Sequence, residues 1–203
     1  MAIQITQDDL KKIEAGIRNK YIKVADNPEG LFEYPTGRSG LEAQKYDPEL
    51  VNALPQAVIS SYCGVGNPFS LGPINKGDAV LDIGCGAGVD TILAAMMVGP
   101  TGKAVGIDIV PEMLERAKSN QDMTDFKNVT FKRASGEDLP LTDAEFDVVI
   151  SNGVINLIPD KDVFLKEVMR VLKPGGRLML ADQVTIGSVQ KDIKARLANV
   201  LLQ

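Results

Sequence analysis

The stretch AVLDIGCGAGVD, residues 79–90, decides the fold of this chain. Its opening residues form a short apolar run of the kind that builds a buried strand. The run ends in Gly84, Gly86 and Gly88, which allow a tight turn and let a ligand approach the backbone closely. Residues 90–98 then have helical character. A strand that passes through a glycine-rich turn into a helix predicts a βα unit with a ligand site at the turn.

Downstream of this turn, strands and helices are predicted to alternate. Strands are expected at residues 104–109, 129–133, 146–151 and 177–182, and helices at residues 111–120 and 160–172. Lys173-Pro174-Gly175-Gly176 is expected to end the last helix. This alternation implies right-handed crossovers and helices on both faces of a sheet. We therefore predict a Rossmann-like three-layer α/β sandwich, with a mostly parallel sheet of at least five strands in the order 3-2-1-4-5.

The chain is predicted to divide into an N-terminal helical and loop extension, residues 1–75, and a Rossmann-like domain, residues 76–203. Within the extension, residues 6–24 carry apolar side chains at helical spacing, namely Leu10, Ile13, Ile17, Tyr21 and Val24. That helix either docks on the main domain or covers the active site as a lid. Residues 27–48 carry loop signals, and residues 48–61 are expected to form a short helix.

Composition narrows the function classes. A formal net charge of -5 and a sequence pI of about 4.9 disfavour a nucleic-acid partner, because an acidic surface repels phosphates. Charges or glycines interrupt every apolar stretch well before the roughly 20 residues that cross a bilayer, so no membrane partner is expected. The chain has no histidine and only two cysteines, Cys63 and Cys85, without C-x-x-C spacing. We predict no metal site, no disulfide and a cytoplasmic location.

The glycine loop itself departs from the dinucleotide-binding pattern. In the G-x-G-x-x-G fingerprint the third glycine would fall on Val89, whereas here it arrives one residue early, at Gly88. Asp82 also precedes the first glycine, and its carboxylate would repel a pyrophosphate but suits a ligand with a cationic amino group. An NAD-dependent or nucleotide-sugar enzyme on the same fold is therefore a disfavoured alternative.

The stretch VLDIGCGAG, residues 80–88, resembles motif I of class I S-adenosylmethionine-dependent methyltransferases. The resemblance continues in order through residues 134–140, 147–152 and 172–178. It implies that Asp108, which ends the second predicted strand, binds the ribose hydroxyls, and that Ile109 packs on the adenine. A carboxylate suits the first role because it can accept from both hydroxyls at once.

The resemblance implies S-adenosylmethionine as cofactor and S-adenosylhomocysteine as product. The implied cofactor-binding residues are Asp82, Gly84, Cys85, Gly86, Gly88, Asp108, Ile109, Ser135, Gly136, Glu137 and Asn152. The family often has Asp where this chain has Ser135, which removes one adenine hydrogen bond. Cys85 is expected to be a small packing residue rather than a reactive thiol.

No catalytic residue is assigned from the sequence. The candidates on the substrate side are Asn152, Gly153, Asn156 and Tyr34. The two asparagines are equally well explained by hydrogen bonds to nearby loop backbone. A soft or already ionised nucleophile would need no general base, which agrees with the absence of histidine. A hydroxyl or carbon acid would need one, for which Asp182 and Tyr34 are weak candidates.

A subfamily resemblance points to arsenite methyltransferases of the methyltransferase type 11 group. It rests on residues 66–68, 98–103 and 151–157. Those enzymes hold trivalent arsenic with cysteine thiolates, but their cysteines correspond to Val65 and Gly153 in this chain, and Cys63 is displaced by two residues. A methyltransferase for another small-molecule acceptor is therefore the leading hypothesis. A metalloid methyltransferase and a cofactor-binding protein without acceptor chemistry remain the alternatives.

The C-terminus is short for this fold. Residues 189–202 can supply a further helix, but nothing remains for the antiparallel strand pair that usually completes the sheet. The fifth strand would then be an exposed edge, which proteins normally cover. We expect a partner subunit, as in a homodimer, or the N-terminal segment to cover it, unless the chain is a truncated form.

Overall fold

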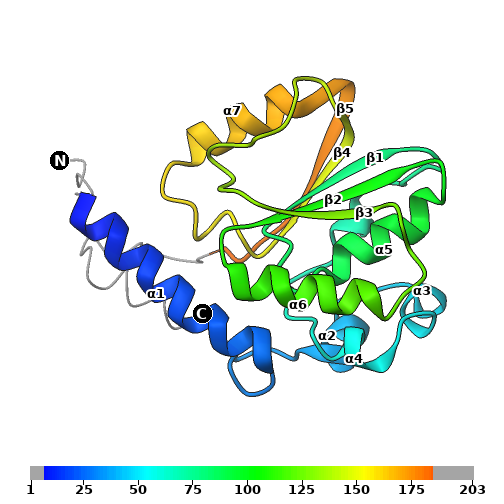
Figure 1. Cartoon of the computed structure of the whole chain (residues 1–203), viewed down its shortest axis with the longest axis horizontal. Helices are drawn as coiled ribbons and strands as arrows, with labels where there is room; N and C mark the ends of the chain where they lie inside the picture. The colour runs from blue at the N-terminus through cyan, green and yellow to red at the C-terminus, as the bar shows by residue number, and fades with distance from the viewer. Residues whose placement is uncertain (1–6, 185–203) are drawn as a thin grey trace.

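The computed structural model describes residues 7–184, and its centre is one five-stranded parallel sheet (Figure 1). The strand order is β3-β2-β1-β4-β5, which confirms the predicted Rossmann-like topology. The strands are β1 (Ala79–Ile83), β2 (Lys103–Asp108), β3 (Val129–Arg133), β4 (Phe146–Asn152) and β5 (Leu172–Ala181). The carboxyl ends of all five therefore meet at one edge, where such a fold binds its ligand.

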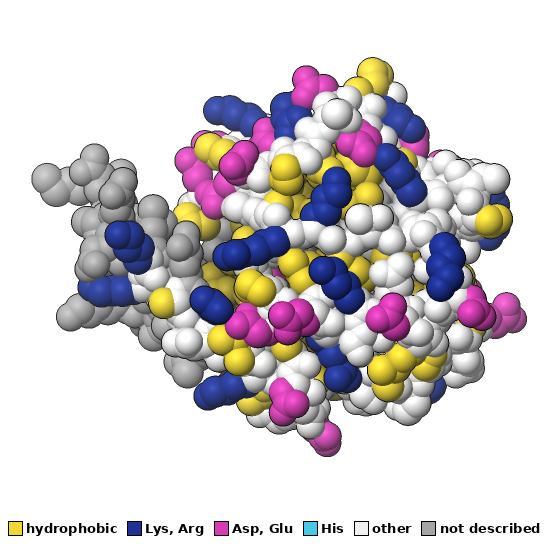
Figure 2. All heavy atoms as spheres, in the orientation of Figure 1, with side chains coloured by type: hydrophobic (Ala, Val, Ile, Leu, Met, Phe, Trp, Pro, Cys, Tyr) yellow, Lys and Arg dark blue, Asp and Glu magenta, His cyan; other side chains and the backbone are white. Residues whose placement is uncertain are grey.

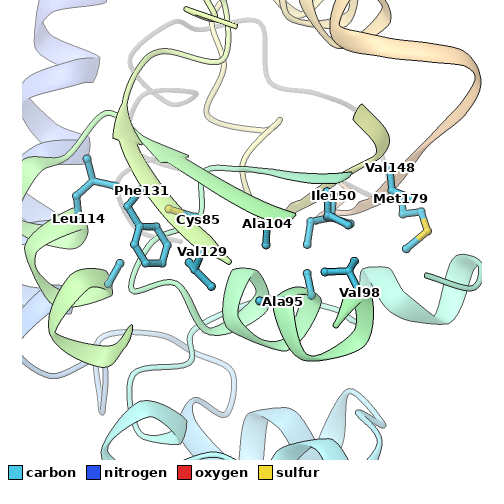
Figure 3. Packing of buried hydrophobic residues seen from close by; sticks show 13 residues of the cluster. Cys85, Ala95, Val98, Ala104, Leu114, Val129, Phe131, Val148, Ile150 and Met179 are labelled. Carbon is cyan, nitrogen blue, oxygen red and sulfur yellow. The ribbon is translucent and has the colours of Figure 1, made fainter. Parts of the chain in front are cut away.

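Helices cover both faces of the sheet, as predicted. On one face, α5 (Val89–Val98) and α6 (Pro111–Asp122) bury a cluster that includes Val98, Leu114 and Phe131 (Figure 3). On the other face, α7 (Lys161–Val171) buries Phe164 and Val168 against the sheet. All of β1 is buried between these layers, which explains its continuous apolar run.

The end of α7 differs from the prediction. The helix ends at Val171, and Lys173-Pro174-Gly175-Gly176 lies inside β5 instead of before it. Leu172 pairs with Phe146, and regular pairing resumes at Arg177 after a shift in register. The prediction of a strand that begins at residue 177 was therefore wrong. The proline-glycine sequence does break the helix, but the backbone continues as an irregular strand.

The N-terminal part contains α1 (Gln7–Asp26), α2 (Gly37–Ala43), α3 (Pro48–Asn52), α4 (Gln56–Ile59) and the 3₁₀ helix η1 (Pro68–Leu71). The prediction of a single helix over residues 48–61 was wrong, because Pro55 lacks an N–H and separates α3 from α4. Residues 27–48 were predicted to be loop because of their turn-forming residues, but they contain the helix α2. The predicted helix at residues 189–202 and the missing strand pair lie outside the described residues.

The N-terminal part shares a core with α5. Leu41, Ile59 and Tyr62 pack with Ile92 and Leu93 in one buried cluster. The helix is thus covered by the sheet on one side and by α2 to α4 on the other, which explains why it is apolar almost all round. These short helices therefore form one wall beside the carboxyl ends of the strands.

The segment before β1 also contacts the edge strand. The Arg177 guanidinium donates to the carbonyl of Pro73, and a Cβ placed on Gly66 would lie 2.8 Å from the Cβ of Ala181. These contacts place residues 66–73 against side chains of β5, and the covering of its free edge stays a prediction. Across residues 7–184, no helix is both long enough and apolar enough to span a membrane.

Candidate active site

The glycine loop between β1 and α5 adopts a backbone that side chains would obstruct. Gly84 and Gly88 have φ angles of 73° and 79°, in the left-handed region. A Cβ on Gly88 would lie 2.6 Å from the ring of Phe131, and one on Gly84 would lie 2.3 Å from a methyl group of Val154. The loop therefore fits tightly between the sheet core and the segment after β4.

A cavity of about 880 Å³ opens beside this loop. That volume is within the range of roughly 300–1,000 Å³ typical of small-molecule and cofactor sites. The cavity is lined by the carboxyl ends of β1, β2 and β4, by residues 133–137, by residues 61–64 and by one side of α1. It brings together the predicted cofactor residues except Gly88, whose neighbours Ala87 and Val89 line it instead, and three of the four predicted substrate-side residues.

Asp108 lies at the end of β2 on the cavity wall. Its two carboxylate oxygens accept hydrogen bonds of 2.9 Å from the backbone N–H groups of Gly86 and Val110. Burial raises the pKa of this carboxyl, and those hydrogen bonds act in the opposite direction. The backbone of Ile109 also contributes, but a carboxylate has about four accepting positions, so Asp108 can still accept from a ligand.

The segment after β3 forms the neighbouring wall. Ser135, Gly136 and Glu137 all line the cavity, as does Ile109, whose side chain is 41% exposed. The Oγ of Ser135 accepts from the N–H of Glu137, and a Glu137 oxygen accepts from the N–H of Asp160. The carboxylate of Glu137 thus ties this segment to the start of α7.

Two buried carboxylates lie beside the glycine loop. Asp82 in β1 accepts a 2.6 Å hydrogen bond from Thr91, and burial together with nearby Asp90 raises its pKa well above the usual value. Burial also raises the pKa of Asp90 to about 6, although hydrogen bonds from Asn152 and Tyr46 lower it. Sequence reasoning missed Asp90. Its position in the first turn of α5, two residues after the third glycine, was the available signal.

Cys85 packs inside the core between the sheet and α6. Its side chain is buried, and burial raises the pKa of its thiol. A Cβ on Gly106 would lie 2.9 Å from its sulfur, so the neighbouring strand approaches it closely. This environment is that of a packing residue, as expected.

The predicted substrate-side residues do not all reach the cavity. Asn152, Gly153 and Tyr34 line it, whereas Asn156 does not, and the backbone N–H of Asn156 donates to Asp182. The Tyr34 hydroxyl donates to the carbonyl of Cys63 at 3.1 Å. Burial raises the pKa of Tyr34, so the phenol stays protonated at neutral pH.

Val65 and Gly153 are neighbours in space although they are far apart in the sequence. A Cβ on Gly153 would lie 3.3 Å from a methyl group of Val65. The two positions at which the resemblance implies arsenic-binding cysteines therefore lie side by side, and here they hold a valine and a glycine. Cys63 also lines the cavity, and burial raises the pKa of its thiol to about 12.

The helix α1 closes the cavity from the N-terminal side. Ile17, Arg18 and Tyr21 are among the residues of α1 that line it. The Arg18 guanidinium pairs with Glu112 of α6 at 3.0 Å, and Val24 is buried against Met113. In Figure 1, α1 runs beside α6 and extends past the sheet.

Known proteins resemble this chain in sequence and in fold. A model of the methyltransferase domain family matches residues 74–201. The arsenite methyltransferase of Halobacterium salinarum is 38% identical over 165 residues, which are 81% of this chain and 42% of that protein. The demethylmenaquinone methyltransferase of Lactobacillus johnsonii is 39% identical over 106 residues, which are 52% of this chain and 43% of that protein.

Among solved structures, CrArsM, an arsenic(III) S-adenosylmethionine methyltransferase from Chlamydomonas reinhardtii, has a TM-score of 0.56 and 36% identity. The match covers 73% of this chain and 50% of that one. Three curated arsenite methyltransferases match most of this chain, and the chain spans only about half of their length. The family model covers residues 74–201, and the sheet order and the glycine loop agree with that match. The chain therefore belongs to the methyltransferase domain family, in its class I S-adenosylmethionine-dependent branch.

Proposed function

We propose that the protein is an S-adenosylmethionine-dependent methyltransferase that transfers a methyl group to a small-molecule acceptor by in-line displacement. One observation carries this proposal: the glycine loop and the strand-end carboxylate of Asp108 share a single cavity of about 880 Å³. A cavity of this size, at the carboxyl ends of the strands, suits a cofactor together with a small acceptor.

The residues on the wall fit the cofactor. We propose that Asp108 binds the ribose hydroxyls and that Ile109 with residues 135–137 holds the adenine. The backbone of Gly84, Cys85, Gly86 and Gly88 would lie along the cofactor, with Asp82 toward its cationic amino group. When bound, the cofactor supplies a methyl group that is activated by a positively charged sulfur.

The chain's own contribution is to align the acceptor and to exclude water. The helix α1 and the loop at residues 61–64 cover the cavity and are suited to exclude solvent. Tyr34 stays protonated and its single hydroxyl proton is already donated to the Cys63 carbonyl, so it is a poor base. This favours an acceptor whose attacking atom is soft or already ionised.

Calorimetry tests the choice of cofactor. We expect S-adenosylhomocysteine to bind and NAD not to bind, because Val89 replaces the third glycine of the dinucleotide fingerprint. Binding of NAD without binding of S-adenosylhomocysteine would contradict the proposal.

Asp108→Ala tests the site itself. The substitution should weaken binding of S-adenosylhomocysteine by about 1–3 kcal/mol, the cost of losing charge-assisted hydrogen bonds. Asp122→Ala, which removes an exposed carboxylate outside the cavity lining, is the matched control and should bind as the wild type does. Equal affinity of the two variants would remove Asp108 from the cofactor site.

The acceptor requires a separate experiment. Incubation with methyl-labelled cofactor, first with arsenite and then with a pool of small metabolites, distinguishes the three hypotheses. The relatives favour arsenite, whereas the apolar contact between Val65 and Gly153 favours another acceptor. Cofactor binding without any labelled product would indicate a binding protein without acceptor chemistry.

A small-molecule acceptor, a cytoplasmic location and a homodimer also remain our proposals. Figure 2 shows acidic and basic side chains interspersed over one face, an arrangement that does not offer a nucleic acid a uniformly basic surface there. Both cysteines are free thiols, which fits a reducing compartment. Light scattering would test the homodimer.

A further inference from the structure

Asn152, at the end of β4, uses its whole amide on protein partners. Its Oδ1 accepts from the backbone N–H groups of Val65 and Gly66 at 2.9 Å and 3.1 Å. Its Nδ2 donates to the Gly66 carbonyl at 2.8 Å and to Asp90 at 2.9 Å. A primary amide has two acceptor lone pairs and two N–H donors, so no capacity remains for a ligand.

Asp90 and two tyrosines complete this arrangement, which we call the clamp. The Tyr46 hydroxyl donates to Asp90 at 2.8 Å, and the Tyr62 hydroxyl donates to the Gly66 carbonyl at 2.9 Å. The rings of Tyr46 and Tyr62 meet edge to face, with centroids 5.3 Å apart. The clamp thus joins β4, the first turn of α5 and the N-terminal part, which are distant in the sequence.

The clamp holds residues 63–66, a segment whose first two residues belong to the cavity wall. A Cβ on Gly64 would lie 2.3 Å from Nδ2 of Asn152, so the backbone passes directly over the amide. Cys63 and Gly64 line the cavity, and the carbonyl of Cys63 accepts a hydrogen bond from the Tyr34 hydroxyl. Movement of this segment would therefore shift both Cys63 and the support of Tyr34.

We infer that Asn152 is a positioning residue and not a ligand of cofactor or acceptor. It acts through residues 63–66, which it fixes against α5 by way of Asp90. That these residues form the acceptor wall rests on the proposed function, whereas the clamp itself is independent of it. The inference separates Asn152 from Asp108, whose carboxylate retains accepting capacity.

Labelling of the Cys63 thiol tests the clamp without any knowledge of the acceptor. Asn152→Ala removes all the amide hydrogen bonds to residues 63–66, and alkylation of Cys63 by iodoacetamide should accelerate about tenfold or more. Peptide mass spectrometry separates Cys63 from the buried Cys85, whose unchanged labelling shows that the core remains folded. Labelling of Cys63 at the wild-type rate would overturn the inference.

Asn128→Ala is the matched control. The Asn128 amide likewise clamps a loop, donating to the carbonyls of Ala95 and Gly99 at 3.2 Å and 2.9 Å, but at the opposite end of the sheet. It should leave Cys63 labelling within about threefold of the wild type. If Asn152→Ala fails to fold, Tyr62→Phe removes one donor of the clamp and should give a smaller acceleration. No acceleration in that variant would also count against the clamp.

Exchanging the side chains of residues 90 and 152 distinguishes a positioning role of Asn152 from simple filling of space. Asn152→Asp sets a carboxylate against Asp90 and should label at least as fast as Asn152→Ala. The double variant Asn152→Asp with Asp90→Asn restores one amide and one carboxylate, and its labelling should return to within about threefold of the wild type. If the double variant labels as fast as Asn152→Asp, the pair does not orient the segment.

Cofactor affinity separates the two proposals. Asn152→Ala should change the dissociation constant of S-adenosylhomocysteine by less than about threefold. A loss of tenfold or more with unchanged Cys63 labelling would make Asn152 a cofactor ligand and overturn the inference. Failure of the wild type to bind S-adenosylhomocysteine would instead contradict the proposed function, and the labelling result would still decide the clamp.

Discussion

At the scale of single residues, the unusual feature is a pair of buried carboxylates beside the glycine loop. Asp82 and Asp90 are 2% and 8% exposed, and hydroxyl and amide donors, not cations, supply the hydrogen bonds that the structure shows to them. Burial therefore raises the pKa of both. A positively charged ligand would reduce this electrostatic cost, which suits the proposed sulfonium cofactor.

The pKa of Asp90 predicts how stability depends on pH. Its value is raised from 3.8 to about 6, so between those pH values the folded protein holds a proton that the unfolded chain releases. The Asp90 contribution to the free energy of unfolding should thus fall as pH rises from about 4 to about 6, by an amount on the order of 3 kcal/mol, and stay constant above. Urea unfolding at several pH values measures it.

Asp90→Asn is the comparison for this measurement, because other carboxyls also titrate in the same range. The variant should lose the decrease that the wild type shows between pH 4 and pH 6. If both proteins show the same pH dependence, the raised pKa of Asp90 does not contribute to folding stability.

At the scale of elements, the turn that begins α5 has the strictest steric requirement. Gly88 is the N-cap of α5, and a Cβ there would lie 2.6 Å from Phe131 and 3.0 Å from Ala117. The third glycine of the loop is therefore needed to let α5 and α6 pack closely on the sheet, independently of any ligand. The sequence shows the glycine but not this contact.

Gly88→Ala should accordingly destabilise the protein by about 2–4 kcal/mol, which adds overpacking to the strain of a left-handed backbone. Gly175→Ala is the control, since Gly175 has a similar φ of 81° with nothing within 4 Å of a Cβ, and should cost only about 1–2 kcal/mol. Equal losses in urea unfolding would show that the Phe131 contact is not limiting.

The helix α1 is held to the domain by modest interactions. The Arg18–Glu112 pair is 57% and 31% exposed at its side chains, and pairs of this kind contribute about 0.2–1 kcal/mol. The burial of Ile17 and Val24 adds an apolar contact. A helix that is held by such modest interactions can serve as a lid over the cavity, one of the two roles expected from the sequence.

At the scale of the whole molecule, the fold brings distant positions into one wall. Val65 belongs to the segment before the sheet and Gly153 follows β4, yet a Cβ placed on Gly153 would lie 3.3 Å from a Val65 methyl group. Both cysteines are among the residues that line the cavity, but Cys63 is half-buried, whereas Cys85 is buried and packs in the core. The wild type should therefore bind trivalent arsenic weakly, because one thiolate cannot reproduce a multi-thiolate site.

Val65→Cys combined with Gly153→Cys would add two thiols at neighbouring positions near Cys63 and should raise the affinity for arsenite by about tenfold or more, at the cost of strain at Gly153, whose φ is 75°. The single variant Val65→Cys is the control and should gain less. Thiol titration with and without arsenite measures binding. Tight arsenite binding by the wild type would favour the metalloid alternative and contradict the weak binding expected here.

Local order along the chain was enough to predict the fold and to select the residues of the proposed cofactor site. Both follow from local order along the chain: an apolar strand, a glycine turn, a helix, and an acidic residue at the end of the next strand. Because parallel strands place their carboxyl ends at one edge, Asp82, the glycines and Asp108 had to lie together.

The arrangement of the proposed acceptor side is visible only in the tertiary structure. The clamp of Asn152, Asp90 and the two tyrosines joins segments that no spacing rule relates, and their hydrogen bonds form only after the N-terminal part packs on α5. The sequence marked Asn152 as a candidate but could not show that its amide is fully occupied. Hydrogen-bonding capacity is consumed by neighbours in space, and those neighbours are fixed by packing.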